Sequence, residues 1–491
     1  MIEFGEWLPD QSDLNNTGAT EAKNVIPALR GYRCFRGLSA LSGAATNKIL
    51  GMYAGKADDG NTTLYVGDSG KLYKMSAADS SLTDIKKSGG YSTTGGNTWR
   101  FAQFGETLIA INRDDNPQTI TIAGAGLFSD LGGSPPKAKY IAVVRDQVMM
   151  ANVNDAVDGE KPYRIWWSAI NSATGWTSGT NLSDYQDVVD VGNCTGLIGG
   201  EYAIALFEKS IVRATFVGAP LIYQFDKLTN NRGCAIPGSV ASVGPSLVFF
   251  LSEDGFYMLR GSEIVPIGAQ KINNWFLDRF KWASRANMVS AVDPIHQNVI
   301  WAYPSVSSGD GENDEIIIYN YHLNRWSHAE QATTAIAQLF TAGYTLEELD
   351  NISNNIDTLP ASLDDGLYQG GTFFFAGAED KKVSSFAGSA LAATIETGEF
   401  SVSPGKHSLV NNVLPYVSAG AGQSPSITAA VGSRSLQTAV PTFTDASAIN
   451  AAGYCPVRSN GAYHRIRIAI ADDAFDTAQG VDVDVQQIGL R

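Results

Sequence analysis

The residues that could carry chemistry are few, and the most suggestive is a serine in the sequence GDSG at residues 67–70. Such a serine acts as a nucleophile only when a histidine base and a buried aspartate lie within reach. The chain has five histidines, and all of them follow Ser69: His296, His322, His328, His407 and His464. Because the triad order that accompanies this motif places the histidine before the serine, we expect a hairpin turn here.

Nucleotide and zinc sites also have little support in the sequence. Gly55 and Lys56 are followed by Ala57, so the hydroxyl with which a phosphate-binding loop holds magnesium is missing. His322 and His328 are six residues apart and have no third ligand nearby in the sequence. This spacing favours histidines of a hairpin over zinc ligands.

Two acidic segments could attract cations. Residues 310–315 (DGENDE) lack the ordered ligand spacing of a calcium loop, so we expect a solvated turn. Asp482 and Asp484 lie on one face of an alternating strand, and we expect them to face solvent. The sequence therefore predicts no catalytic residue, no metal ligand and no cofactor, and we expect the protein not to be an enzyme.

The four cysteines, Cys34, Cys194, Cys234 and Cys455, lie far apart and form no CxxC pair. This pattern favours reduced, mostly buried thiols in a protein assembled in the cytosol, with disulfide bonds or a metal site as the alternative. The amino terminus has neither a basic segment nor an apolar run, so no signal peptide is expected. The longest apolar runs are of strand length and are too short to cross a membrane.

The composition indicates which elements position these residues. Hydrophobic residues make up 44% of the 491 residues, charged residues only 17% and aromatic residues 10%, and there are 50 glycines. This composition excludes intrinsic disorder, collagen and coiled coil, and it indicates short strands joined by tight turns. The formal net charge of −15 argues against non-specific DNA binding, which depends on lysine and arginine.

Units of strand, turn and strand recur along the chain. They begin near residues 64, 104, 143, 203, 248, 299 and 373, a mean spacing of about 50 residues, which is close to the period of propeller blades. In the strongest unit, residues 247–259, Asp254 and Gly255 supply the turn. We therefore predict an all-β protein with a six- or seven-bladed β-propeller over residues 46–390. An array of β-sandwiches is the alternative.

The C-terminal region differs from the propeller. From about residue 390 aromatic residues almost vanish, and polar and apolar residues alternate in residues 462–470. This pattern predicts an additional β-sandwich over residues 391–491, which would act as a docking platform. Helix is scarce and is expected over residues 272–285 and, within a long loop, in residues 345–359.

The first 45 residues are expected to form an extended N-terminal arm. Trp7, Leu8, Val25 and Ile26 are its apolar anchors for docking and assembly. An extended strand of this kind can add to the sheet edge of a neighbouring subunit. We expect the removal of residues 1–25 to leave a soluble monomer that no longer assembles.

The middle of the chain carries an ordered series of motifs. They are RIWWSAINSATGW at residues 164–176, DYQD at 184–187, FEKSIVR at 207–213, FVGAPLIYQF at 216–225, NRGCAIPGS at 231–239, LSEDGF at 251–256 and IIIYNYHLNRWS at 316–327. In this order they resemble the β-propeller tail hub or nozzle proteins of short-tailed, podovirus-like bacteriophages. That group includes packaged-DNA-stabilisation proteins, and the resemblance covers residues 100–390.

The resemblance implies a structural protein of the virion tail, assembled in the host cytoplasm. Such proteins form a homo-oligomeric ring, commonly of six copies, below the portal and the head-to-tail adaptor, and they meet tail fibre or spike proteins. The ring would close the DNA exit channel during packaging and conduct the DNA at ejection, without sequence-specific contact. An acidic ring suits this role because it does not adhere to DNA. Arg232 could bridge subunits or form a local ion pair.

Two other functions remain open. The chain could be a host-receptor-binding, lectin-like propeller, which would show exposed aromatic residues clustered at one pocket. It could also be a glycan hydrolase, which would need a pair of carboxylates in a cleft. A nozzle would instead show a ring with a lumen as wide as DNA and no deep pocket.

Overall fold

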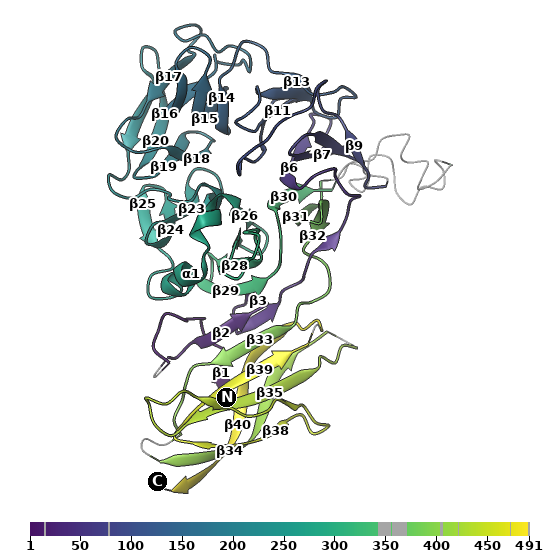
Figure 1. The fold of residues 1–491 in the computed structure, drawn as a ribbon, viewed down its shortest axis with the longest axis vertical. Helices are drawn as coiled ribbons and strands as arrows, with labels where there is room; N and C mark the ends of the chain where they lie inside the picture. The colour runs from purple at the N-terminus through teal and green to yellow at the C-terminus, as the bar shows by residue number, and fades with distance from the viewer. Residues whose placement is uncertain are drawn as a thin grey trace.

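The computed structural model describes residues 1–13, 16–76, 79–341, 355, 371–402, 406–420, 422–471 and 473–489. They form a ring of small sheets from the middle of the chain and a second group of sheets from its two ends (Figure 1). The helix expected within residues 345–359 falls outside the described residues, apart from position 355. None of the described helices is long and apolar enough to span a membrane.

The ring is a β-propeller, and the described residues form seven blades of four antiparallel strands each; the sheet of blade 6 continues beyond its fourth strand into the C-terminal sheets. Blade 1 comprises β6 (Ile49–Lys56), β7 (Thr62–Asp68), β8 (Leu72–Met75) and β9 (Leu82–Asp84). Blade 2 comprises β10 (Arg100–Phe104), β11 (Thr107–Ile111), β12 (Gln118–Thr121) and β13 (Ser129–Asp130). Blade 3 comprises β14 (Lys137–Val144), β15 (Gln147–Asp155), β16 (Gly159–Trp167) and β17 (Asp184–Asp187). The prediction of an all-β propeller is confirmed.

The remaining four blades continue around the ring. Blade 4 comprises β18 (Cys194–Ile198), β19 (Ala203–Phe207), β20 (Ile211–Gly218) and β21 (Ile222–Lys227). Blade 5 comprises β22 (Ala241–Ser242), β23 (Leu247–Ser252), β24 (Gly255–Arg260) and β25 (Glu263–Pro266). Blade 6 comprises β26 (Val289–Asp293), β27 (Asn298–Tyr303), β28 (Glu315–Asn320) and β29 (Arg325–Glu330). Blade 7 comprises β30 (Ala335–Phe340), β31 (Phe373–Glu379), β32 (Lys382–Ser385) and β5 (Ser39–Ala40).

The apolar runs of the sequence form strands that are buried on both faces. In β19 of blade 4, Ala205 and Phe207 pack in one cluster with residues of blade 3. Ile204 and Leu206 point the other way and pack in a second cluster with residues of blade 5. Because each blade is covered on both faces by its neighbours, its inner strands read as continuous apolar segments.

The N-terminal segment closes the ring. Ser39 and Ala40 of β5 pair with Ser385 and Ser384 of β32, so the outermost strand of blade 7 comes from the opposite end of the chain. The propeller therefore draws a strand from residues 1–45, which the sequence places in a separate arm. The expected boundary near residue 390 falls between β32 and the next strand, β33 (Ala393–Thr397).

The second group of sheets lies below the ring in Figure 1. One sheet runs β3 (Val25–Pro27), β4 (Tyr32–Cys34), β40 (Thr477–Gly489), β34 (His407–Ser418) and β38 (Cys455–Gly461), and β1 (Ile2–Glu3) pairs with β40. The other contains β2 (Ala19–Lys23), β33, β39 (Tyr463–Ile470), β35 (Ile427–Arg434), β36 (Thr442–Phe443) and β37 (Ser447–Ala448). Their alternating apolar residues share one buried cluster, which contains Val410 and Val413 of the first sheet and Ile466 of the second.

The helix expected over residues 272–285 is two short elements. They are α1 (Asn273–Arg279) and the 3-10 helix η2 (Trp282–Asn287); a second 3-10 turn, η1 (Pro237–Ser239), precedes β22. The break falls at Phe280, whose backbone is extended and pairs with Ser305, while the Lys281 N–H donates to Pro304 O at 2.9 Å. The hydrogen bonds to blade 6 thus end the helix that the apolar spacing predicts.

Candidate functional site

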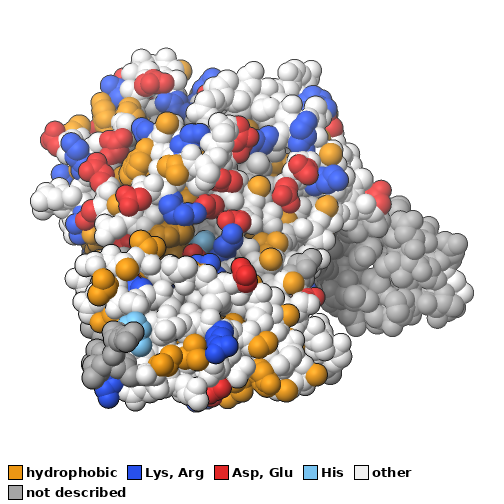
Figure 2. All heavy atoms as spheres, turned by 60° about the horizontal axis from the view of Figure 1, so that its bottom comes forward, with side chains coloured by type: hydrophobic (Ala, Val, Ile, Leu, Met, Phe, Trp, Pro, Cys, Tyr) orange, Lys and Arg blue, Asp and Glu red, His pale blue; other side chains and the backbone are white. Residues whose placement is uncertain are grey.

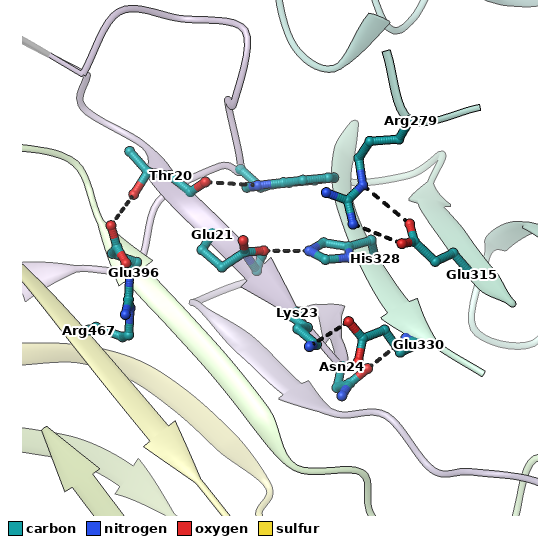
Figure 3. A network of polar contacts seen from close by, with 12 residues as sticks. Thr20, Glu21, Lys23, Asn24, Arg279, Glu315, His328, Glu330, Glu396 and Arg467 are labelled. Carbon is teal, nitrogen blue, oxygen red and sulfur yellow. Dashed lines mark hydrogen bonds and ion pairs between the residues drawn. The ribbon is translucent and has the colours of Figure 1, made fainter. Parts of the chain in front are cut away.

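The candidate site is the joint between the propeller and the C-terminal sheets, where β2 lies between β29 and β33 (Figure 3). The pairing of β2 with β33 is antiparallel and extends from Ala19 to Lys23. Its pairing with β29 is parallel and consists of the single pair Lys23 and His328. Because only one residue pair joins the backbones of β2 and β29, side chains make most of the contacts between β2 and the propeller.

A buried pair, Glu21 and His328, spans this short connection. The Nε2 of His328, whose side chain is 3% exposed, hydrogen-bonds to Glu21 Oε1. The ring of Trp7 stacks on the imidazole at 4.9 Å between centroids, and Trp275 packs at the same distance. Burial raises the pKa of Glu21, but the charge and hydrogen bond of His328 outweigh it and hold that pKa below its ordinary value. The carboxylate of Glu21 is thus held charged against the propeller.

Asn24, which follows β2, connects both parts through its backbone and its amide. Its N–H donates to His328 O at 2.7 Å, and its Oδ1 accepts from the Glu330 N–H at 2.8 Å. Its Nδ2 donates to Ala392 O, just before β33, at 2.8 Å. Asn24 has a φ of +58°, a conformation that asparagine tolerates better than most residues. One residue thereby fixes the spacing between β29 and β33.

Further ion pairs surround the joint (Figure 3). Lys23 Nζ lies 2.6 Å from Glu330 Oε1, and Arg279 Nη2 lies 2.8 Å from Glu315 Oε1. On the C-terminal side, the buried Glu396 accepts a hydrogen bond from Arg467 at 2.7 Å and forms an ion pair with Arg465 at 2.9 Å. Of these pairs only Lys23 with Glu330 runs from β2 to the propeller, and the others hold the two sides of the joint rigid within themselves.

Residues before β2 are fastened to the propeller as well. Arg325 of β29 donates to Gly5 O at 2.6 Å and to Phe4 O at 3.1 Å. The carboxylate of Asp10 accepts from the backbone N–H groups of Asn274 and Trp275, both at 2.8 Å. The N-terminal segment therefore runs along the propeller before it enters the C-terminal sheets.

Most of the residues predicted for docking are buried in the core of the chain itself. Trp7 and Val25 are fully buried, Leu8 is 7% exposed, and Ile26 is half-buried against a cluster of blade 6 and blade 7. Arg232 lies apart from the joint, where it pairs with Asp254 at 2.8 Å and covers the ring of Tyr257. In the single chain Arg232 makes the local ion pair, and a role of any of these residues between subunits stays a prediction.

The other motifs of the sequence occupy structural positions. Asp68 of the GDSG segment accepts from the N–H groups of Gly70 and Lys71, both at 2.7 Å, and so builds the turn between β7 and β8. Asp482 holds the N-terminal amine and the hydroxyl of Tyr416. Among the described residues no group of three or more His, Cys, Asp and Glu side chains could hold a metal ion. All four cysteines are free thiols.

No motif of the sequence marks the joint. His328 lies in the hairpin of β28 and β29, as expected, but the structure also buries it against Glu21, 307 positions away. His464 is likewise buried, between the hydroxyls of Ser408 and Ser433 at 2.8 and 2.7 Å. No local pattern gave a signal for this, because β29 reads RWSHAE and its polar residues resemble those of an exposed strand.

A cavity of about 580 Å³ occupies the centre of the propeller. The first strands of the blades line its wall. Residues 94–98, which link blades 1 and 2, meet η2, which links blades 5 and 6, across the ring: a Cβ added to Gly96 would lie 2.9 Å from that of Ala286. This contact between opposite sides of the ring closes one end of the cavity.

Comparisons with known proteins give no family for the chain: no family model and no curated protein matches it. Among solved structures, the computationally designed Ika8 protein has a TM-score of 0.38 at 9% identity, over 74% of this chain and 95% of that chain. The Pan2 WD40 domain of Neurospora crassa has a TM-score of 0.39 at 7% identity, over 71% and 94%. YCF48 bound to D1 peptide has a TM-score of 0.34 at 12% identity, over 62% and 86%. The chain is a propeller because of the order of the strands in its own sheets, independently of these similarities.

Proposed function

We propose that the protein is a structural subunit of a short-tailed bacteriophage tail, of the nozzle or hub type. Copies of the chain would form a ring that closes the DNA exit and then conducts the DNA. In this role the propeller and the C-terminal sheets act as one mechanical body, and no bond of a substrate is broken. The partners would be the adaptor, the portal and the tail fibres or spikes.

The joint is the observation that carries this proposal. A protein that closes a passage under load needs parts that keep their relative position. Here Glu21, Asn24 and Lys23 bind blade 6 on one side, and β2 forms a backbone ladder with β33 on the other. The motifs that resemble tail proteins, at residues 164–327, fall on blades 3 to 6, and blade 6 is the blade that carries the joint.

The distribution of charge is compatible with a DNA passage. Figure 2 shows acidic and basic side chains interspersed over the propeller face that it draws. Exposed basic side chains of the propeller are paired with acids, such as Arg232 with Asp254 at 2.8 Å. With a net charge of −15, a ring of such subunits would repel DNA and let it slide.

Electron microscopy of the purified full-length chain, alone and with the adaptor of the encoding phage, tests the proposal. We expect closed rings whose lumen admits duplex DNA, and a molar mass by light scattering that is a multiple of 52.3 kDa. A chain that stays monomeric at high concentration and with the adaptor would contradict the proposal.

The central cavity favours a second function, a receptor-binding propeller. It is a deep pocket with partly exposed aromatic residues, Tyr53 and Phe101, on its wall. Binding to cells of a host, competed by soluble surface glycans, would support this function over the nozzle. A ring that forms with the adaptor and shows no binding to cells would support the nozzle.

A further inference from the structure

The cavity in the centre of the propeller is basic, although the chain as a whole is acidic. Arg100, Lys139 and Arg285 line it, and no aspartate or glutamate is among the described residues of its wall. Arg100 and Lys139 lie on the neighbouring first strands β10 and β14, and the guanidinium of Arg100 covers the ring of Tyr140 at 4.9 Å.

Two neighbouring basic side chains outside the cavity have acceptor partners within the chain. Arg113 pairs with Glu160 at 3.3 Å, and Lys137 donates to the carbonyl oxygen of Asp114 at 2.6 Å. The side chains of Arg100 and Lys139 have no hydrogen bond or ion pair with another described residue. Burial and the charges of Arg100 and Arg113 lower the pKa of Lys139, and they outweigh the opposing effect of Asp114. An anion in the cavity would remove this unfavourable electrostatic interaction.

The wall offers two further kinds of contact. The first strand of each blade is an edge of its sheet, so the backbone groups on its inner side are open to the cavity where no neighbour binds them, as the Trp99 N–H binds Leu50 O. The rings of Tyr53 and Phe101 stack at 5.8 Å, and both line the cavity. Its volume of about 580 Å³ lies within the range of about 300–1,000 Å³ that small-molecule sites occupy.

We propose that this cavity binds a small organic anion, with the anionic oxygens between Arg100 and Lys139 and the ring of the ligand against the aromatic wall. A guanidinium binds carboxylate and phosphate oxygens in the same paired geometry, so both a phosphate ester and a sugar acid fit this chemistry. Because η2 closes one end, the ligand enters from the other. The inference stands on the cavity alone and does not depend on a role in a phage tail.

Isothermal titration of the full-length protein at low salt tests the proposal with three probes: inorganic phosphate, adenosine monophosphate and glucuronate. We expect at least one organic anion to bind in a saturable manner and more tightly than inorganic phosphate. The tighter of the two identifies the source as a phosphate ester or a sugar acid. No saturable binding of any probe would overturn the proposal.

Matched variants locate the binding. Lys139→Met and Arg100→Met should each weaken the binding of the tighter organic anion at least tenfold. Lys137→Met is the control: it lies two residues from Lys139 on the same strand but outside the cavity, and it should keep the affinity within about twofold. Circular dichroism checks that each variant is folded. An equal loss in Lys137→Met would show that binding depends on overall charge and would overturn the proposal.

Discussion

At the scale of single residues, His328 is the polar group on which the joint depends most. Its side chain is buried against two tryptophan rings that also contact each other, and the one hydrogen-bonding partner of its imidazole among the described residues is Glu21. A buried polar group without a partner costs more than the net gain of a satisfied hydrogen bond. Moving β2 away from β29 would therefore leave the buried imidazole without a partner and raise the free energy of the folded chain. The contact is thus specific as well as stabilising.

Glu21→Gln tests the pair because it keeps the shape of the side chain and removes its charge. We expect the free energy of unfolding at neutral pH to fall by about 1–2 kcal/mol, since one third of the Glu21 side chain is exposed and solvent screens the interaction. Because the folded chain holds the pKa of Glu21 below its ordinary value of 4.5, the stabilisation is complete above that pH and is lost as the pH falls further. Urea unfolding monitored by tryptophan fluorescence measures both effects.

Glu330→Gln on β29 is the matched control. Its partner Lys23 is 2.6 Å away, but 53% of the Glu330 side chain is exposed, so we expect a change within about 0.5 kcal/mol. If Glu21→Gln leaves the unfolding curve at neutral pH unchanged, or if its effect persists well below pH 4.5, the ion pair does not stabilise the joint.

At the scale of elements, the N-terminal segment is the part that joins the others. Its strands pair with β40 through β1 and β4, with β33 and β29 through β2, and with β32 through β5. It is extended, as the sequence predicts, but in the single chain its apolar residues complete the chain's own core. Residues 1–25 include Trp7, Ala19, Ala22 and Val25, all fully buried.

Trp7→Ala should lower the free energy of unfolding by about 3–5 kcal/mol, because it removes a fully buried indole and uncovers His328. We accordingly expect deletion of residues 1–25 to give an aggregated or poorly folded chain, where the sequence alone suggests a soluble monomer. Differential scanning calorimetry and size-exclusion chromatography measure the two effects. Leu29→Ala, at an 82% exposed position, is the control and should change stability by less than about 0.5 kcal/mol. A deletion that remains monodisperse with an unchanged melting temperature would contradict this prediction.

The blades could be predicted from the sequence, and the joint could not. A blade is a local structure: β23 and β24 are joined by a two-residue turn, and their apolar runs and Gly255, at a φ of +135°, are visible in one short window. The joint depends on pairs such as Thr20 with Glu396, 376 positions apart, which no local pattern encodes. The strand β5 in blade 7 is two residues long and exposed, so it carries no apolar signal.

At the scale of the whole molecule, the charge and the closed cavity together constrain how DNA could meet the protein. The contact between Gly96 and Ala286 closes one end of the propeller, so duplex DNA cannot pass through a single chain. A passage for DNA would therefore lie between copies of the chain. Its wall would come from the outer surfaces of a chain whose sequence contains 50 acidic and 35 basic residues.

The purified protein should therefore not retain duplex DNA at physiological salt, in the monomeric or the ring form. Non-specific binding requires lysines and arginines that neutralise phosphates, and its affinity falls steeply as salt rises. Here Arg100 and Lys139, whose side chains have no acidic partner among the described residues, line a cavity that is too small for a duplex. Electrophoretic mobility shift with linear DNA at several salt concentrations measures this, with a basic DNA-binding protein as the positive control. A shift that weakens with added salt would reveal a basic surface formed between subunits, and the ring would then hold DNA by charge instead of closing its exit.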